Sequence, residues 1–280
     1  MMAQAVVRLR EAGLAASDAA LDADVLIRHL LAWDRATLLL HRDEPMPADV
    51  GATFSHLIAR RVKREPVAYL TGTREFYGRD FAVSPAVLIP RPETELIVDA
   101  VLRGSPPSAP WRIADVGTGS GILAVTIACE RPRVAVVATD VSMAALQVAR
   151  RNAQAHGVDN RIAFVAGDLL APAAGPFDVI VSNPPYVPAR DATALAPDVR
   201  DFEPAFALFG GEAGLDLVQR LLVDAAARLA PAGTFVMEFG AGQQYDVAHH
   251  ATRAGFEVLE IAHDLQQIPR AIICRLRADR

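Results

Sequence analysis

Seven short runs rich in β-branched residues follow Pro92, and most of them are separated by amphipathic stretches long enough to form a helix. This alternation is typical of a parallel β-sheet covered by helices on both faces. Only residues 263–270 join the last two runs, too few for a helical crossover, so we expect these two strands to pair antiparallel. The predicted strands are Arg112–Val116, Val134–Asp140, Ile162–Val165, Asp178–Ser182, Thr234–Phe239, Phe256–Ala262 and Ala271–Leu276.

The first part of the chain has a different pattern. From Ala3 to about Glu65 the apolar residues recur at helical spacing, which predicts a small helical domain. Ser17 or Asp18 is placed to cap the helix that contains residues 21–30.

The segment 75–83 carries aromatic and β-branched residues on either side of Gly78 and Arg79, which predicts a short β-hairpin with its turn at these two residues. We therefore expect three parts in the chain. They are a helical domain at 1–73, a β-hairpin linker at 74–91, and a domain built on the seven-stranded sheet at 92–280.

The composition limits the class of protein. Lys and Arg number 28 against 33 Asp and Glu, and the resulting net charge of −5 disfavours broad binding to nucleic acid phosphates. Cys129 and Cys274 form no C-x-x-C pair, so neither a disulfide framework nor a zinc site is predicted. Charged residues interrupt the apolar positions of the N-terminal segment, so neither a signal peptide nor a membrane-spanning run is predicted there. We expect a cytoplasmic monomer without a membrane partner.

A glycine-rich segment, Asp115–Gly121, follows the first predicted strand of the sheet and opens a helix at Ile122. Glycines there let a ligand approach the backbone near a helix N-terminus. The spacing is G-x-G-x-G, and the preceding acid is awkward for a pyrophosphate but suits the ammonium of a methionyl group. The segment therefore predicts S-adenosylmethionine as the cofactor, bound by Asp115, Gly117, Thr118, Gly119, Ser120 and Gly121. The alternative is a tight turn without a ligand.

Two further acids follow the next two strands. Asp140 ends the second strand, where its carboxylate can accept hydrogen bonds from both ribose hydroxyls. Asp168 follows the third strand and is predicted to contact the adenine amino group, with Leu169 covering the ring. The alternative for Asp168 is a helix cap or a turn residue.

The segment Ser182–Tyr186 stands at the end of the fourth strand, where open α/β sheets place their ligands. An amide or exocyclic amine nitrogen is a poor nucleophile until acceptors hold its N–H groups. The side-chain oxygen of Asn183 and the carbonyl of Pro184 can supply them, and Pro184 and Pro185 carry no N–H donor. Tyr186 can stack on the planar acceptor. Asn183, Pro184 and Tyr186 are thus the candidate catalytic residues; the alternative is a Pro-rich turn.

This pair of motifs predicts methylation of a planar nitrogen without separating a glutamine side chain from adenine, cytosine or guanine. One hypothesis is therefore a glutamine methyltransferase, and another is a nucleic-acid amino-group methyltransferase acting on a flipped base. A third is a non-catalytic adaptor that keeps the cofactor fold and only binds a partner, against which the intact Asn183 and glycine segment argue.

The sequence resembles the HemK/PrmC-type protein-(glutamine-N5) methyltransferases, which modify peptide chain release factors, over nearly its whole length. The family's hairpin region resembles Arg64–Gly72 and Glu75–Gly78. Its inter-domain signature resembles Val87–Glu95, and its two active-site motifs resemble Asp115–Gly121 and Asn183–Tyr186.

The resemblance implies a class I methyltransferase fold whose helical N-terminal domain helps to grip the release factor. It implies that the cofactor, bound by Gly117–Gly121 and Asp140, donates its methyl group to the glutamine of a Gly-Gly-Gln loop held by Asn183–Tyr186. The position that is usually aromatic after the third strand is Leu169. A relative that methylates a ribosomal protein differs at the stretch 90–95, which favours the release factor as substrate.

Other charged groups have plainer interpretations. The basic run Arg60, Arg61, Lys63 and Arg64 is either a solvated helix face or a docking surface. Arg91 and Glu93 are typical of a helix start with a local ion pair. The histidines show no ligand spacing, so no metal is predicted.

Overall fold

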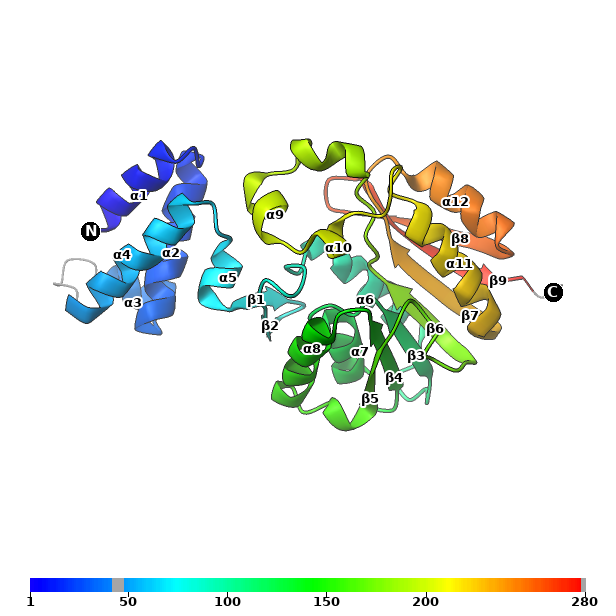
Figure 1. Cartoon of the computed structure of the whole chain (residues 1–280). Coiled ribbons are helices and arrows are strands. Elements are labelled where there is room, and N and C mark those ends of the chain that lie inside the picture. The colour runs from blue at the N-terminus through cyan, green and yellow to red at the C-terminus, as the bar shows by residue number, and fades with distance from the viewer. Residues whose placement is uncertain (42–47, 278–280) are drawn as a thin grey trace. The chain divides into compact units, whose positions relative to one another are not determined.

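The computed structural model describes residues 1–41 and 48–277, and contacts divide the chain into two units (Figure 1). The first unit contains Met1–Thr73 together with Ala196–Phe202, and the second contains Arg74–Leu195 and Glu203–Arg280. The sequence had assigned residues 196–202 to the domain of the sheet. In the structure, residues 196–202 contact the N-terminal helices, which are far away in the sequence, and therefore belong to the first unit.

Helices α1, α2 and α4 of the first unit share an apolar core. Leu9 of α1, Leu26 of α2 and Phe54 of α4 are almost completely buried in one cluster, and burying such a side chain stabilises the fold by roughly 1.5–3 kcal/mol. The helices of this unit are α1 (Met2–Glu11), α2 (Ala16–Leu31), α3 (Arg35–Leu40), α4 (Ala48–Val62), α5 (Val67–Thr71) and α9 (Pro197–Phe202).

The predicted cap of α2 is wrong. The helix begins at Ala16, and the residue before it, Ala15, makes no side-chain capping bond. Ser17 and Asp18 therefore lie inside the first turn. The negative charge of Asp18 still interacts favourably with the positive end of the helix dipole there.

The predicted hairpin is formed by β1 (Thr73–Phe76) and β2 (Arg79–Ala82). Its turn consists of Tyr77 and Gly78, with φ angles of 53° and 71°, whereas the sequence analysis placed it at Gly78 and Arg79. Positive φ at both central residues matches the tight turn that fits the right-handed twist of two strands. Arg79 thus begins the second strand.

The second unit is built on a seven-stranded sheet with the order β5-β4-β3-β6-β7-β9-β8. The pairs from β5 to β7 are parallel, while β9 is antiparallel to both β7 and β8. This confirms the predicted fold class, including the antiparallel last strand. The strands are β3 (Arg112–Val116), β4 (Ala135–Asp140), β5 (Ile162–Ala166), β6 (Phe177–Ser182), β7 (Leu229–Glu238), β8 (Phe256–His263) and β9 (Pro269–Leu276).

Strand β7 starts earlier than predicted. The sequence places its first residue at Thr234, because Pro231 and Gly233 are typical of a loop. In the structure Leu229 already pairs with Phe177, and the register shifts before Thr234 pairs with Val179. The irregular segment between them is absorbed as a bulge in the strand.

Helices cover both faces of the sheet (Figure 1). Apolar residues of α6, α7 and α8 pack on one face, and those of α11 and α12 pack on the other. The remaining elements of this unit are η1 (Pro92–Thr94), α6 (Glu95–Gly104), α7 (Ile122–Glu130), α8 (Met143–Ala155), η2 (Asp159–Arg161), η3 (Ala189–Ala194), α10 (Ala205–Leu208), α11 (Asp216–Arg228) and α12 (Gln244–Arg253). Within residues 1–41 and 48–277, every helix is too short or too polar to cross a membrane.

Candidate active site

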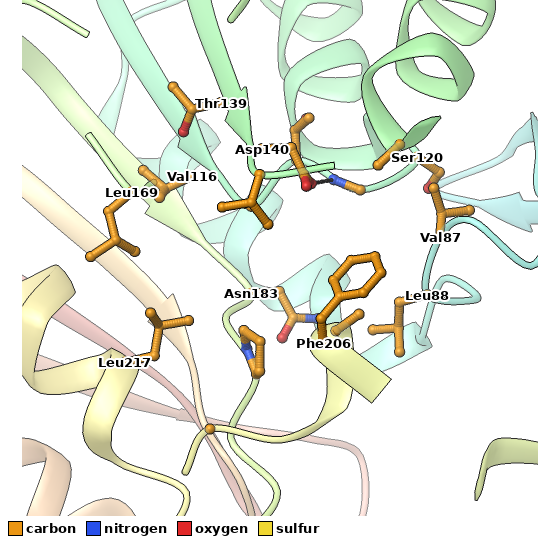
Figure 2. Close-up of a pocket in the computed structure, with 18 of the residues that line it drawn as sticks. Val87, Leu88, Val116, Ser120, Thr139, Asp140, Leu169, Asn183, Phe206 and Leu217 are labelled. Atoms are coloured by element: carbon orange, nitrogen blue, oxygen red, sulfur yellow. Dashed lines mark hydrogen bonds between the residues drawn. The ribbon is translucent and has the colours of Figure 1, made fainter. Parts of the chain in front are cut away.

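A cavity of about 430 Å³ lies at the carboxyl ends of the central parallel strands. Strand β3 has β4 on one side and β6 on the other, and open α/β sheets bind ligands where the strand order reverses in this way. All of the residues that line the cavity belong to the second unit. Figure 2 shows Leu169 and Leu217 on one side and Val87 and Leu88 on the other.

The structure brings most of the predicted cofactor residues to this cavity. Asp115 and Gly121 do not line it, and neither do Pro184 and Tyr186 of the acceptor motif. Those that line it are Gly117, Thr118, Gly119, Ser120, Asp140, Asp168, Leu169, Asn183 and Pro185.

The glycine segment forms a backbone cradle. The amides of Gly117 and Thr118 both donate to the Thr139 carbonyl at 2.9 Å, which joins the ends of β3 and β4. Gly117 has a φ of 71°, and a β-carbon placed there would meet no protein atom within 4 Å. Bare backbone therefore faces open space at this position, as a closely approaching ligand requires.

Gly121 has a different role from Gly117. A β-carbon on Gly121 would lie 3.0 Å from the β-carbon of Ala149 in α8. This glycine therefore lets the loop pack against α8, and its contribution to the cavity is indirect.

The carboxylate of Asp140 supports the glycine segment. Its Oδ2 accepts from the amide of Gly119 at 2.9 Å (Figure 2). Its Oδ1 accepts from the amide of Ser142 at 2.8 Å. Burial raises the pKa of Asp140 above its usual range. The side chain lines the cavity while it holds the loop in place.

Asp115 lies beneath the cradle. Its Oδ2 accepts from the Thr118 hydroxyl at 2.6 Å and from the amide of Ala124 at 3.1 Å. Its Oδ1 is buried, with no hydrogen-bond partner among the described atoms, and burial raises the pKa of Asp115 to about 7. The side chain thus ties the loop to the start of α7.

Asp168 and Leu169 lie at the end of the cavity next to α11. The Asp168 carboxylate is half-exposed and forms an ion pair with Arg220, which also lines the cavity. Leu169 is buried and has a positive φ of 48°. An apolar wall therefore stands beside an exposed ion pair at this end.

Several cavity residues were missed by the sequence analysis. Val87 and Leu88 were recorded only as part of a family signature, and Phe206 and Leu217 were not singled out at all. Phe206 is 52% exposed although it lines the cavity together with Asn183. An exposed aromatic side chain beside a polar motif carries no periodic signal, so nothing in the sequence pattern marks it.

The side chain of Asn183 is held by two residues from distant parts of the chain. Its Nδ2 donates to the Thr94 hydroxyl at 3.0 Å, and that hydroxyl donates to Oε2 of Glu238 at 2.6 Å. Glu238 is almost completely buried at the end of β7, and burial raises its pKa to about 7. The sequence analysis named neither Thr94 nor Glu238 as a site residue.

Tyr186 points to the same carboxylate. Its hydroxyl lies 3.1 Å from Oε1 of Glu238, and its carbonyl accepts from the side chain of Gln243 at 3.0 Å. Burial raises the pKa of Tyr186 above its ordinary value. These bonds anchor the end of the acceptor motif to the segment between β7 and α12.

Arg91 forms an ion pair with a residue far along the chain. Its Nη2 lies 2.5 Å from Oε1 of Glu203, and the amide of Ile89 donates to Oε2 of the same carboxylate at 3.1 Å. The predicted local ion pair at the helix start is therefore wrong, because the partner of Arg91 lies 112 positions away. Glu203 holds the segment before η1 to the chain that leads into α10.

The basic run at 60–64, which begins in the last turn of α4, is largely paired inside the first unit. Arg60 pairs with Glu65, Arg61 pairs with Asp22 and Asp198, and Arg64 also pairs with Asp198. Within residues 1–41 and 48–277, His, Cys, Asp and Glu side chains form no cluster that could hold a metal ion.

Two family models match the chain. The PrmC N-terminal domain matches residues 1–72, and the methyltransferase small domain matches residues 94–198.

Curated relatives match almost the full length. A release factor glutamine methyltransferase from Koribacter versatilis is 44% identical over 260 residues, which cover 91% of this chain and 90% of the relative. One from Cereibacter sphaeroides is 42% identical and covers 98% of this chain and 96% of its own length.

Solved structures share the fold of the second unit's sheet. A methyltransferase from Pyrococcus furiosus has a TM-score of 0.54 at 20% identity, covering 79% of this chain and 98% of its own. A 16S rRNA N2 G1207 methyltransferase from T. thermophilus, in complex with AdoMet and guanosine, has a TM-score of 0.54 at 19% identity, covering 73% of this chain and 50% of its own. These likenesses show a class I methyltransferase fold.

Proposed function

This chain belongs to the release factor glutamine methyltransferase family, and on that premise we propose that it methylates the side-chain amide nitrogen, N5, of the glutamine in the Gly-Gly-Gln loop of peptide chain release factors. The observation that carries the proposal is the position of Asn183, whose side chain lines the same cavity as the glycine segment. The amide acceptor and the methyl donor would therefore meet in one place.

The residues at the cavity fit S-adenosylmethionine. The cofactor supplies an electrophilic methyl group when it is bound and leaves as S-adenosylhomocysteine. The bare backbone of Gly117, together with Thr118, Gly119 and Ser120, would hold the methionyl group at the N-terminus of α7. Asp115 would act on this loop from beneath, through its bonds to Thr118 and Ala124.

The other end of the cavity suits a nucleoside. Asp140 ends β4 with a carboxylate that can accept from ribose hydroxyls. Leu169 and Leu217 offer an apolar wall for the adenine ring (Figure 2). Asp168, which also lines the cavity, could accept from the adenine amino group.

The acceptor motif orients the glutamine amide. The Oδ1 of Asn183, which lines the cavity, would accept one N–H group of the glutamine amide, and holding this group weakens the delocalisation of the nitrogen lone pair into the carbonyl. The carbonyl of Pro184 was predicted to accept the second N–H group, but Pro184 does not line the cavity. Pro185 lines the cavity, and as a proline it has no backbone N–H group that could donate a hydrogen bond to the glutamine oxygen. The methylated nitrogen loses its surplus proton to water, so no strong base is needed.

An aromatic residue can cover the flat face of the amide. The sequence analysis gave this role to Tyr186, which does not line the cavity and instead contacts Glu238. Phe206 lines the same cavity as Asn183 and is 52% exposed. We assign the covering role to Phe206, and Tyr186 supports the motif from behind.

A protein acceptor is favoured over a nucleic acid by charge. The net charge is −5, and three arginines of the basic run are engaged in ion pairs within the first unit. The phosphate-binding surface that nucleic-acid enzymes use is therefore not supplied by this run. The first unit would instead dock the release factor in the cytoplasm, where translation takes place, and a single copy of the chain holds all of the site residues.

The test combines methyl-labelled S-adenosylmethionine, the purified protein and a bacterial release factor, with peptide mass spectrometry to locate the label. We expect label on the glutamine of the Gly-Gly-Gln loop, and no label with Asn183→Ala or with a release factor in which that glutamine is replaced. Label transferred only to ribosomal protein or nucleic acid in a cell extract would overturn the proposed substrate.

A further inference from the structure

We propose that Thr94 and Glu238 are positioning residues that fix the orientation of the Asn183 amide, so that its oxygen, and not its nitrogen, faces the acceptor. The proposal rests on the proposed function and deepens it, since it explains how the site presents an acceptor to the N–H groups of glutamine.

The three side chains form a hydrogen-bonded relay from β7 to the acceptor motif. Glu238 Oε2 lies 2.6 Å from the Thr94 hydroxyl, and that hydroxyl lies 3.0 Å from Nδ2 of Asn183. Thr94 and Glu238 are 0% and 1% exposed. The bond between these two side chains is therefore shielded from water, which could otherwise compete for the Thr94 hydroxyl.

The direction of the relay follows from the chemistry of its members. A carboxylate can only accept hydrogen bonds, so the single hydroxyl proton of Thr94 is donated to Glu238. The Thr94 oxygen then has only lone pairs to offer Asn183, and only the NH₂ group of the asparagine can bind them. The amide is thus locked with Oδ1 on its opposite side, and Figure 2 shows the Asn183 side chain at the cavity.

This orientation decides whether glutamine can bind. The reacting group of the acceptor is an NH₂, which needs an oxygen as its partner. A reversed Asn183 would present its own NH₂ to that group and leave two donors facing each other. Leaving a polar group unpaired in a closed site weakens binding roughly ten- to hundredfold.

Protonation of Glu238 would reverse the relay. A protonated carboxyl can donate to the Thr94 oxygen, which frees the Thr94 proton for Oδ1 of Asn183. The pKa of Glu238 is raised to about 7, chiefly by burial and in small part by Glu93, against the opposing effects of Thr94, Tyr186 and Arg270. Methyl transfer at saturating cofactor should therefore decline as the pH falls below about 7.

The first experiment measures kcat and KM for the release factor with Thr94→Val and Thr94→Ser, and measures cofactor affinity separately. Valine has the shape of threonine without the hydroxyl, so kcat/KM should fall about ten- to hundredfold, while cofactor affinity stays near wild type. Serine restores the hydroxyl and should restore most of the activity.

The matched control is Thr126→Val in α7. Thr126 is fully buried, and its hydroxyl has no hydrogen-bond partner among the described residues. The same substitution there should leave kcat/KM within about twofold of wild type, because no directed bond is lost. Thr94→Val behaving like Thr126→Val, in a preparation whose wild type methylates the release factor, would overturn the relay and leave the proposed function standing.

The second experiment compares the pH profiles of kcat for wild type and Glu238→Gln. Glutamine cannot titrate, and its amide oxygen can still accept from Thr94, so the acidic decline should disappear in the variant. An identical acidic decline in both proteins would show that Glu238 does not control the orientation. A wild type that transfers no methyl to the release factor at any pH would overturn the proposed function.

Discussion

Asp198 and Arg61 form an ion pair of 2.7 Å inside the first unit, although 137 positions separate them in the chain. Arg61 is 7% exposed and also pairs with Asp22, and Arg64 binds the other oxygen of Asp198. The segment after the acceptor motif is thus attached to the helical unit by a shared carboxylate.

We predict that Asp198→Asn loosens this attachment. The amide cannot accept two charged donors as the carboxylate does, and hydrogen bonds to charged groups contribute about 1.5–3 kcal/mol. The segment 196–202 should be cut faster in limited proteolysis, and the first unit should melt at a lower temperature. Asp201→Asn is the control, because Asp201 is exposed and pairs with its neighbour Arg200. Equal proteolysis of the two variants would contradict the prediction.

Substitutions of three glycines should separate packing from cofactor contact. Gly117, Gly121 and Gly157 all have positive φ, and an alanine in this region costs about 1–2 kcal/mol. Gly157→Ala meets no atom within 4 Å and should show this strain alone. Gly121→Ala also collides with Ala149, so it should lower the melting temperature further.

Gly117→Ala should match Gly157→Ala in stability. It should also weaken cofactor binding, because the added methyl group would occupy the space in which the cofactor contacts the backbone of residue 117. Thermal melting and titration with S-adenosylmethionine measure the two effects. Full cofactor affinity in Gly117→Ala would argue against the cradle.

Replacing the buried acid of the cavity should affect cofactor binding more than replacing the exposed one. Asp140→Asn loses one acceptor for the loop amides and the ribose. We therefore expect its affinity for S-adenosylmethionine to be about ten- to hundredfold weaker. Asp168→Asn removes an exposed pair with Arg220, which contributes only about 0–1 kcal/mol. Calorimetric titration of both variants checks this order, and a larger loss for Asp168→Asn would reverse our assignment.

The second unit should be more stable at pH 6 than at pH 8. Burial raises the pKa values of Asp115 and Glu238 to about 7 from ordinary values of 3.8 and 4.5. Between those values and 7 the folded protein holds protons that the unfolded chain has released, so stability falls as the pH rises through this window. Melting curves should show a smaller pH difference for Asp115→Asn than for Asp80→Asn, which alters an exposed side chain. Equal pH dependence in the two variants would count against the raised pKa of Asp115.

The sequence by itself determined the features that depend on local pattern. Alternating β-branched and amphipathic runs indicated the strands and their covering helices, and the short link at 263–270 indicated the antiparallel end of the sheet. The glycine segment and the Asn183–Tyr186 motif stand at the carboxyl ends of β3 and β6, and they come together because those strands are parallel neighbours.

Only the tertiary structure decided which side chains complete the site. Thr94 lies 89 positions from Asn183 and 144 from Glu238, so no periodicity or spacing relates the three residues. Their meeting depends on the sheet order that brings β7 beside β6 and on the helix start that lies over both strand ends. Hydrophobic periodicity records which face of each element is buried, whereas a hydrogen bond between buried side chains depends on positions set by the whole packed unit.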